Sequence, residues 1–130
     1  MMKWTLMRCH EELGTQPKNP RWSWSGRSAD GKRVSVQLWQ DLFTEGGKRY
    51  ATGILTPNMP WVGTPGHREL IDNLIWARDR LDGIVSVIIV VAKDRKSEPR
   101  AIDRCFPQPK LQMVIRELDD TTGAFTLERI

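Results

Sequence analysis

Residues 64–93 read TPGHRELIDNLIWARDRLDGIVSVIIVVAK, and this stretch decides the fold class. Its first part predicts a helix over about residues 65–82. Thr64 suits the N-cap, Pro65 suits the first helical position, and Asp82-Gly83 ends the segment. Apolar residues recur at helical spacing, so one face of this helix should pack on a sheet. They are Leu70, Ile71, Leu74, Ile75 and Leu81.

The second part of the stretch, IVSVIIVVA (residues 84–92), is an almost unbroken apolar run. A run this rich in Val and Ile is typical of a strand buried on both faces near the middle of a sheet.

Two residues of the predicted helix over residues 65–82 depart from its apolar pattern. Trp76 projects away from the apolar face, whereas Arg78 falls inside that face and should snorkel past its edge or pair with a carboxylate.

Shorter segments on either side predict further strands and two hairpins. Asp30-Gly31 and the segment DDTTG (residues 119–123) are turn signals between alternating segments. Three prolines make TPNMPWVGTPG (residues 56–66) a loop, and EELGTQPKNP (residues 11–20) is also expected to be a loop. The expected strands are residues 3–9, 21–27, 32–39, 50–56, 84–93, 110–118 and 123–130.

These elements predict an α+β protein. We expect a mostly antiparallel sheet of five to seven strands with one main helix packed on it. The chain of 130 residues is 39% hydrophobic and 28% charged, which fits one globular domain over residues 1–130 with its own core.

Positive charge is concentrated in two segments of a chain whose net charge is +4. Residues 18–49 hold seven basic and three acidic residues, and residues 93–110 hold six basic and three acidic. Clustered positive charge favours a polyanionic partner. A solvated basic face without a partner is the competing interpretation.

The stretch NPRWSWSG (residues 19–26) raises the question of what its tryptophans do. The chain has six tryptophans, and an indole N–H requires a partner, so tryptophans tend to lie at edges and interfaces. In a strand, Trp22 and Trp24 would share one face, with Trp39 near them if the register allows. Either this face joins the core, or it stacks on nucleobases beside basic side chains. The sequence leaves both possibilities open.

The pattern N-P-R-W-S-W, followed by W-Q-D, resembles small bacterial domains associated with restriction and defence proteins. It covers residues 19–41 only. Because the chain carries no H-N-H nuclease segment, the resemblance implies binding rather than cutting.

The sequence provides little support for catalysis, so no catalytic residue is predicted. It contains no phosphate-binding, dinucleotide-binding or nucleophile-elbow motif. His67 is expected to be a capping or core histidine rather than a general base. Cys9, His10, His67 and Cys105 lack zinc-site spacing, so we expect two reduced, buried thiols, no metal and no cofactor.

Neither a membrane segment nor a signal peptide is recognisable in the sequence, so we expect no membrane partner and a cytoplasmic location. The preferred hypothesis is a non-catalytic accessory module that binds nucleic acid, DNA in preference to RNA, and that inspects bases. The alternatives are a protein-interaction module that uses exposed tryptophans, and thirdly a small-molecule enzyme. The predicted nucleic-acid-binding residues are Lys18, Arg21, Trp22, Trp24, Arg27, Lys32, Arg33, Trp39, Lys93, Arg95, Lys96 and Arg100.

Overall fold

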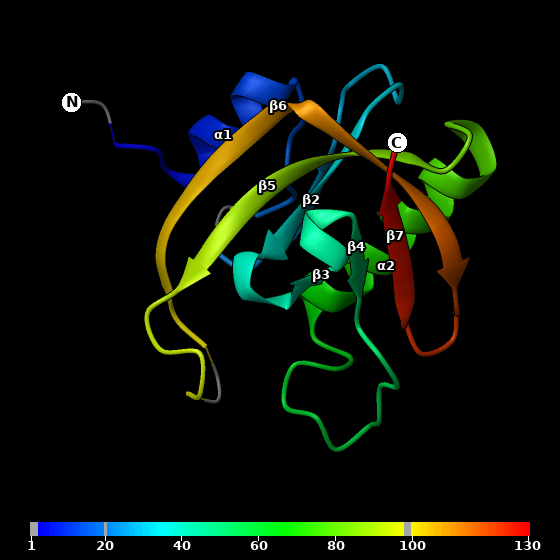
Figure 1. Ribbon diagram of the computed structural model, residues 1–130. Helices are drawn as coiled ribbons and strands as arrows, with labels where there is room; N and C mark the ends of the chain where they lie inside the picture. Colours follow the sequence, from blue (N-terminus) through cyan, green and yellow to red (C-terminus); the bar gives the residue numbers. More distant parts are fainter. Residues whose placement is uncertain (1–2, 20, 98–99) are drawn as a thin grey trace.

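A mixed sheet joins the strands in the order β1-β2-β5-β6-β7-β4-β3 (Figure 1). The computed structural model describes residues 3–19, 21–97 and 100–130. The helices are α1 (Leu6–Leu13) and α2 (Pro65–Arg80), and two short 3-10 turns, η1 (Gln40–Leu42) and η2 (Glu45–Gly47), flank β3. The strands are β1 (Ser25–Arg27), β2 (Val34–Trp39), β3 (Phe43–Thr44), β4 (Arg49–Ala51), β5 (Ile84–Ala92), β6 (Ile102–Leu118) and β7 (Phe125–Arg129).

The predicted α+β class is confirmed, with a seven-stranded, mostly antiparallel sheet and one main helix. Among the described strands, β2 and β5 are the parallel neighbours, and the other pairs are antiparallel. β6 is long enough to pair with β5 along its first part and with β7 along its last part. No helix in the described parts of the chain is long and apolar enough to cross a membrane.

The two helices pack on opposite faces of the sheet. Neighbouring side chains of a strand point to opposite faces, so a single strand contributes side chains to the core under each helix. On β2, Val34, Val36 and Leu38 join the core under α2, whereas Gln37 bonds to His10 of α1. The alternation predicted for β2 is therefore confirmed. β5 is buried on both faces as expected, since Val85, Val87 and Ile89 belong to the α2 core and Ile88 and Val90 to the α1 core.

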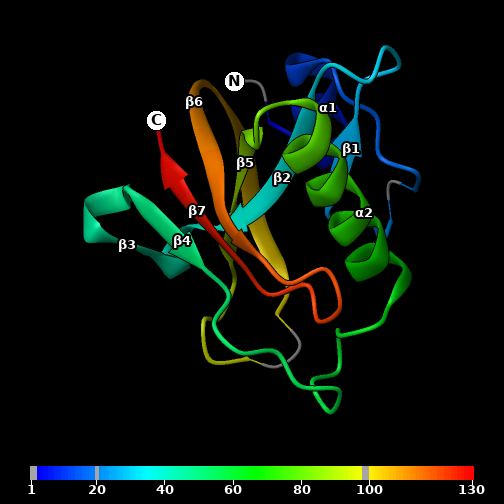
Figure 2. The same cartoon turned by 90° about the vertical axis from the view of Figure 1, so that its right-hand side faces the viewer.

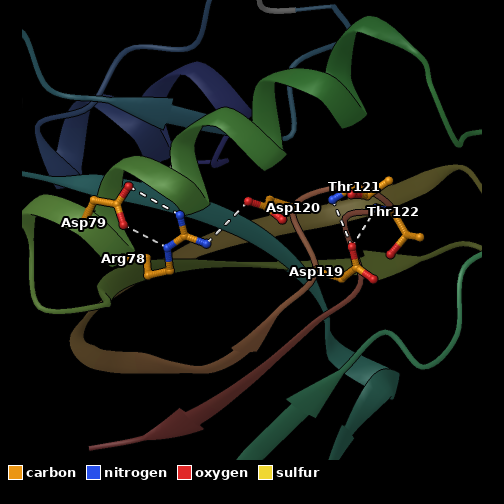
Figure 3. A network of polar contacts seen from close by, with 6 residues as sticks. All are labelled: Arg78, Asp79, Asp119, Asp120, Thr121 and Thr122. Atoms are coloured by element: carbon orange, nitrogen blue, oxygen red, sulfur yellow. Dashed lines mark hydrogen bonds and ion pairs between the residues drawn. The ribbon is translucent and has the colours of Figure 1, made fainter.

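Helix α2 begins and ends where the sequence indicates. The Thr64 hydroxyl accepts a hydrogen bond from the His67 N–H, and Pro65 occupies the first turn. Leu70 and Leu74 are buried in the core. Arg78 pairs with Asp79 and reaches Asp120 in the turn between β6 and β7, so it joins the helix to that turn (Figure 3).

The first expected strand, residues 3–9, is wrong because this segment starts helix α1. Thr5 caps the helix and Gly14 ends it with a positive φ of 74°. Cys9 and Leu13 lie four residues apart and face the sheet together. This is a helical repeat that the apparent alternation of Trp4 and Leu6 concealed.

The strand expected over residues 21–27 is shorter than predicted, and β1 starts only at Ser25. The Asn19 carboxamide oxygen accepts the Arg21 N–H, and the Asn19 carbonyl accepts the Ser23 N–H, so the chain turns here. The turn places Trp22 outside the strand. Consequently, the expectation that Trp22 and Trp24 share one strand face is wrong.

Two other expected strands also differ in length. Only Tyr50 and Ala51 of the expected strand over residues 50–56 belong to a strand, namely β4. In contrast, β6 starts at Ile102, eight residues before the start predicted at Lys110. The hairpin between β6 and β7 and the hairpin between β1 and β2 are confirmed.

Candidate nucleic-acid interface

A row of side chains along α2 holds the N-terminal loop and the β1–β2 hairpin by hydrogen bonds. Figure 2 shows α2 beside β1. The members of this row, Glu69, Asn73, Trp76 and Arg80, are spaced by four, three and four residues, so they share one side of the helix. Glu69 Oε2 accepts the Lys18 N–H at 2.8 Å, which brings the loop to the first half of the helix.

Asn73 is the central clamp of this row. Its side chain is buried, its Nδ2 donates to Ser25 Oγ at 2.8 Å, and its Oδ1 accepts from Arg27 Nε at 3.1 Å. One turn further along, Trp76 Nε1 donates to the Gly31 carbonyl at 2.7 Å. Both ends of β1 are therefore tied to α2, and Arg27 is oriented by a hydrogen bond.

Two guanidinium groups meet at one indole. The Cζ atoms of Arg27 and Arg80 each lie 4.2 Å from the centroid of the Trp76 ring. Within the described residues, neither arginine forms an ion pair with a carboxylate. Cation–π attraction to the ring offsets part of the repulsion between the two like charges. The pair therefore carries positive charge that no ion pair neutralises within the described residues.

Lys32 extends this basic region on the hairpin turn. It is exposed and follows Gly31, whose carbonyl binds Trp76. The Asp30 carboxylate in the same turn accepts hydrogen bonds from the Ser28 hydroxyl and the Lys32 N–H, and these hydrogen bonds lower the pKa of Asp30. We call Arg27, Lys32, Trp76 and Arg80 the hairpin–helix surface.

Other predicted residues lie around this surface in different ways. Lys18, Arg21 and Trp22 are exposed in the loop that runs along the start of α2. The Lys18 N–H in this loop binds Glu69, which lies about 16 Å before Arg80 along the helix axis at 1.5 Å per residue. Arg33 is exposed, but its guanidinium donates to the Leu13 carbonyl on the α1 side. The surface is thus continued by the loop and not by Arg33.

The sequence places the basic segment after β5 in the same predicted set of nucleic-acid-binding residues as the hairpin, but this segment does not share the hairpin–helix surface. β2 and β5 run parallel (Figures 1 and 2). Lys32 therefore lies before the start of β2 and Lys93 lies after the end of β5, with at least the length of β2, about 20 Å for six strand residues, between them. Lys93, Arg95 and Lys96 are exposed and line an open hollow of about 560 Å³ at that far end.

Arg100 and Trp39 hold this far loop in place. The guanidinium donates to both carboxylate oxygens of Asp41, at 2.8 and 2.9 Å, and its Cζ lies 5.1 Å from the Trp39 ring centroid. Hydrogen bonds from Arg100 lower the pKa of Asp41. Arg100 and Trp39 therefore have structural contacts that compete with any ligand.

Trp24 is half-buried in an aromatic cluster at the start of α2. Its ring centroid lies 5.8 Å from Trp61 and 6.1 Å from His67. His67 is buried, its Nδ1 accepts the Gly63 N–H at 3.0 Å, and burial lowers its pKa. It is a core histidine at the start of the helix, as the sequence indicates.

His10 belongs to a buried polar network on the other face. The Gln37 amide donates to His10 Nε2 at 3.3 Å, so the ring proton resides on Nδ1 and donates to Thr15 Oγ1 at 2.9 Å. Thr15 in turn donates to Ser35 at 2.9 Å. Burial lowers the pKa of His10 to about 4, and the neutral ring serves to link α1 to β2.

The cysteines face each other between α1 and β6. Their Sγ atoms lie 3.8 Å apart, and both thiols are free and buried. His67 packs on the opposite face of the sheet, so the set of Cys9, His10, His67 and Cys105 is not assembled. In the described ranges, three or more metal-ligating side chains nowhere come together.

Comparisons with protein-family models, curated proteins and solved structures found no match to this chain. The resemblance of residues 19–41 to restriction and defence domains stays a prediction. Sequence reasoning missed Trp76 and Arg80 as site residues, although their spacing of four on a helix and the position of Trp76 outside the apolar face were visible signals.

Proposed function

We propose that this chain is a nucleic-acid-binding module and that the hairpin–helix surface is its binding site. One observation carries the proposal: Arg27 and Arg80 hold two guanidinium charges on one indole without a carboxylate partner in the described chain. Guanidinium groups bind phosphate oxygens bidentately, and phosphates placed there would relieve the repulsion between the two arginines.

The neighbouring loop extends the basic site along α2, so the site matches a ligand with several successive negative charges. Lys18 and Arg21 add positive charge along the same side of α2. Each phosphate that these groups neutralise releases condensed counterions, so the affinity should fall steeply with salt. DNA is the polymer we would test first, with RNA in parallel.

Arg80→Gln tests the site. Arg80 is exposed in the last turn of α2, so the substitution removes the charge with little effect on stability. We expect about tenfold weaker binding of a labelled 20-mer DNA, because a hydrogen bond to a charged group is lost. We also expect the slope of log affinity against log salt to fall by about 1.

Lys96→Gln is the matched control, because Lys96 is exposed, carries the same charge and lies at the far end of the β2–β5 pair. The salt series is recorded for both variants and the wild type. Equal losses in the two variants would place binding elsewhere on the basic surface. Salt-tolerant affinity, or none at low salt, would contradict nucleic-acid binding altogether.

A further inference from the structure

The indole of Trp76 is already covered, although it lies at the centre of the hairpin–helix surface. The guanidinium groups of Arg27 and Arg80 lie against its ring, and its Nε1 donates a hydrogen bond to the Gly31 carbonyl. A Cβ atom on Gly31 would lie only 2.8 Å from Trp76 Cζ2, so the hairpin backbone closes off the ring edge as well. A nucleobase could stack on Trp76 only by displacing a guanidinium group.

The two arginines nonetheless keep donors for a ligand. Among the described residues, the Arg27 guanidinium donates only through its Nε, to Asn73, and its terminal nitrogens make no hydrogen bond there. The Arg80 guanidinium makes no hydrogen bond with the described residues. The N–H donors of a guanidinium lie in its own plane and suit bidentate hydrogen bonds to phosphate oxygens.

The other tryptophans do not replace Trp76 as a stacking platform. Trp24 and Trp61 pack on each other and on His67, and Trp39 lies beside Arg100. Trp4 packs into the core under α1. Trp22 is the exposed tryptophan, with 37% of its surface accessible, and it lies in the loop outside the hairpin–helix surface.

We infer that the hairpin–helix surface binds the phosphodiester backbone and stacks no base on Trp76. This inference rests on the proposed nucleic-acid-binding function and determines its ligand class: a phosphodiester polymer held by its phosphates, without base stacking. The surface would therefore not inspect bases by stacking, in contrast to the expectation from the sequence.

The experiment compares two single-stranded probes with the same number of phosphates. One is a 20-mer of thymidine, and the other is a 20-mer of abasic deoxyribose phosphate. Affinities are measured at one salt concentration for the wild type, Arg80→Gln and Trp22→Ala. Stacking on even one base strengthens binding by roughly fivefold. We expect the abasic probe to bind within threefold of the thymidine probe, and Arg80→Gln to weaken both equally.

Each outcome has a separate meaning. An abasic probe that binds more than threefold weaker, with the difference kept in Trp22→Ala, would overturn the inference and leave nucleic-acid binding intact. If Trp22→Ala removes the difference, the bases stack on Trp22 in the loop, and the inference for the hairpin–helix surface holds. If neither probe binds at low salt, the proposed function itself fails.

Discussion

Trp76 is the residue at which α2 and the β1–β2 hairpin meet. It donates a hydrogen bond to Gly31 and supports the side chains of Arg27 and Arg80. Tryptophan suits this position because its indole offers a flat apolar face to two cations and one polar N–H to a backbone carbonyl. Asn73, one turn earlier, sets the orientation of Arg27.

Asn73→Ala should lower the free energy of unfolding by about 1–3 kcal/mol, because Ser25 would lose its donor in a buried position. The exposed neighbour Asp72 provides the matched control, and Asp72→Ala should stay within about 0.5 kcal/mol. Denaturant unfolding measures both. Equal stabilities would show that the clamp between α2 and β1 contributes nothing.

His10 should make stability depend on pH between about 6.5 and 4. Its pKa is about 4 in the folded chain and near 6.5 when unfolded, so in this range the unfolded chain binds the extra proton. Stability is therefore fully present above 6.5 and is lost as the pH falls, by about 1.4 kcal/mol per unit at most.

Unfolding free energies at pH 7 and 5, for the wild type and His10→Gln, measure this contribution. The wild type should lose more stability than the variant on acidification. NMR of the His10 ring should show no titration above pH 5 in the folded chain. A titration midpoint near 6.5 would mean that the ring is not held neutral.

At the scale of elements, the caps determine where α2 begins and ends, and one apolar face determines how it packs on the sheet. Leu74 lies at the centre of that face and is fully buried, together with Ala77 one turn later. The helix α1 depends on the same kinds of signals, a threonine cap and a terminal glycine. It differs in having only eight residues, so its packing on β6 contributes most of its stability.

Leu74→Ala should cost about 2–5 kcal/mol, since it removes buried methyl groups and leaves a cavity between α2 and the sheet. Leu42→Ala is the comparison, because Leu42 is 39% exposed and its truncation leaves no cavity. Thermal or urea unfolding gives both values. A loss below 1 kcal/mol for Leu74→Ala would contradict the packing of α2 described above.

At the scale of the whole molecule, α1 and the sheet enclose two thiols. The rate at which these thiols react measures how often α1 separates from the sheet or the whole chain unfolds. Burial raises the pKa of Cys9 to about 12 and also raises that of Cys105. Neither thiol is therefore a reactive thiolate at neutral pH. Their reaction with a reagent requires α1 to leave the sheet, or the whole chain to unfold.

We expect iodoacetamide to alkylate both cysteines slowly and together at pH 8, and rapidly in denaturant, as followed by mass spectrometry. Addition of urea below the unfolding midpoint separates local from global opening. Rapid modification of the native chain would mean that α1 does not cover the thiols.

The sequence by itself determined the α+β class, helix α2 with its caps, the buried strand β5 and both hairpins. These features depend on local chemistry: Thr64 and Pro65 act on the residues beside them, and the Val- and Ile-rich run of β5 needs burial wherever it lies. The segment of α1 was misread because the four apolar residues among residues 3–9 fit either period over so short a stretch.

Only the tertiary structure decided the candidate site. Residues 27 and 76 are separated by about fifty positions, and their contact exists because the row of Asn73 and Trp76 clamps β1. The parallel pairing of β2 and β5 likewise put the two basic segments at opposite ends. Charge and tryptophan content are properties of the chain, whereas the side chains that share a surface depend on strand order and on buried hydrogen bonds between distant residues.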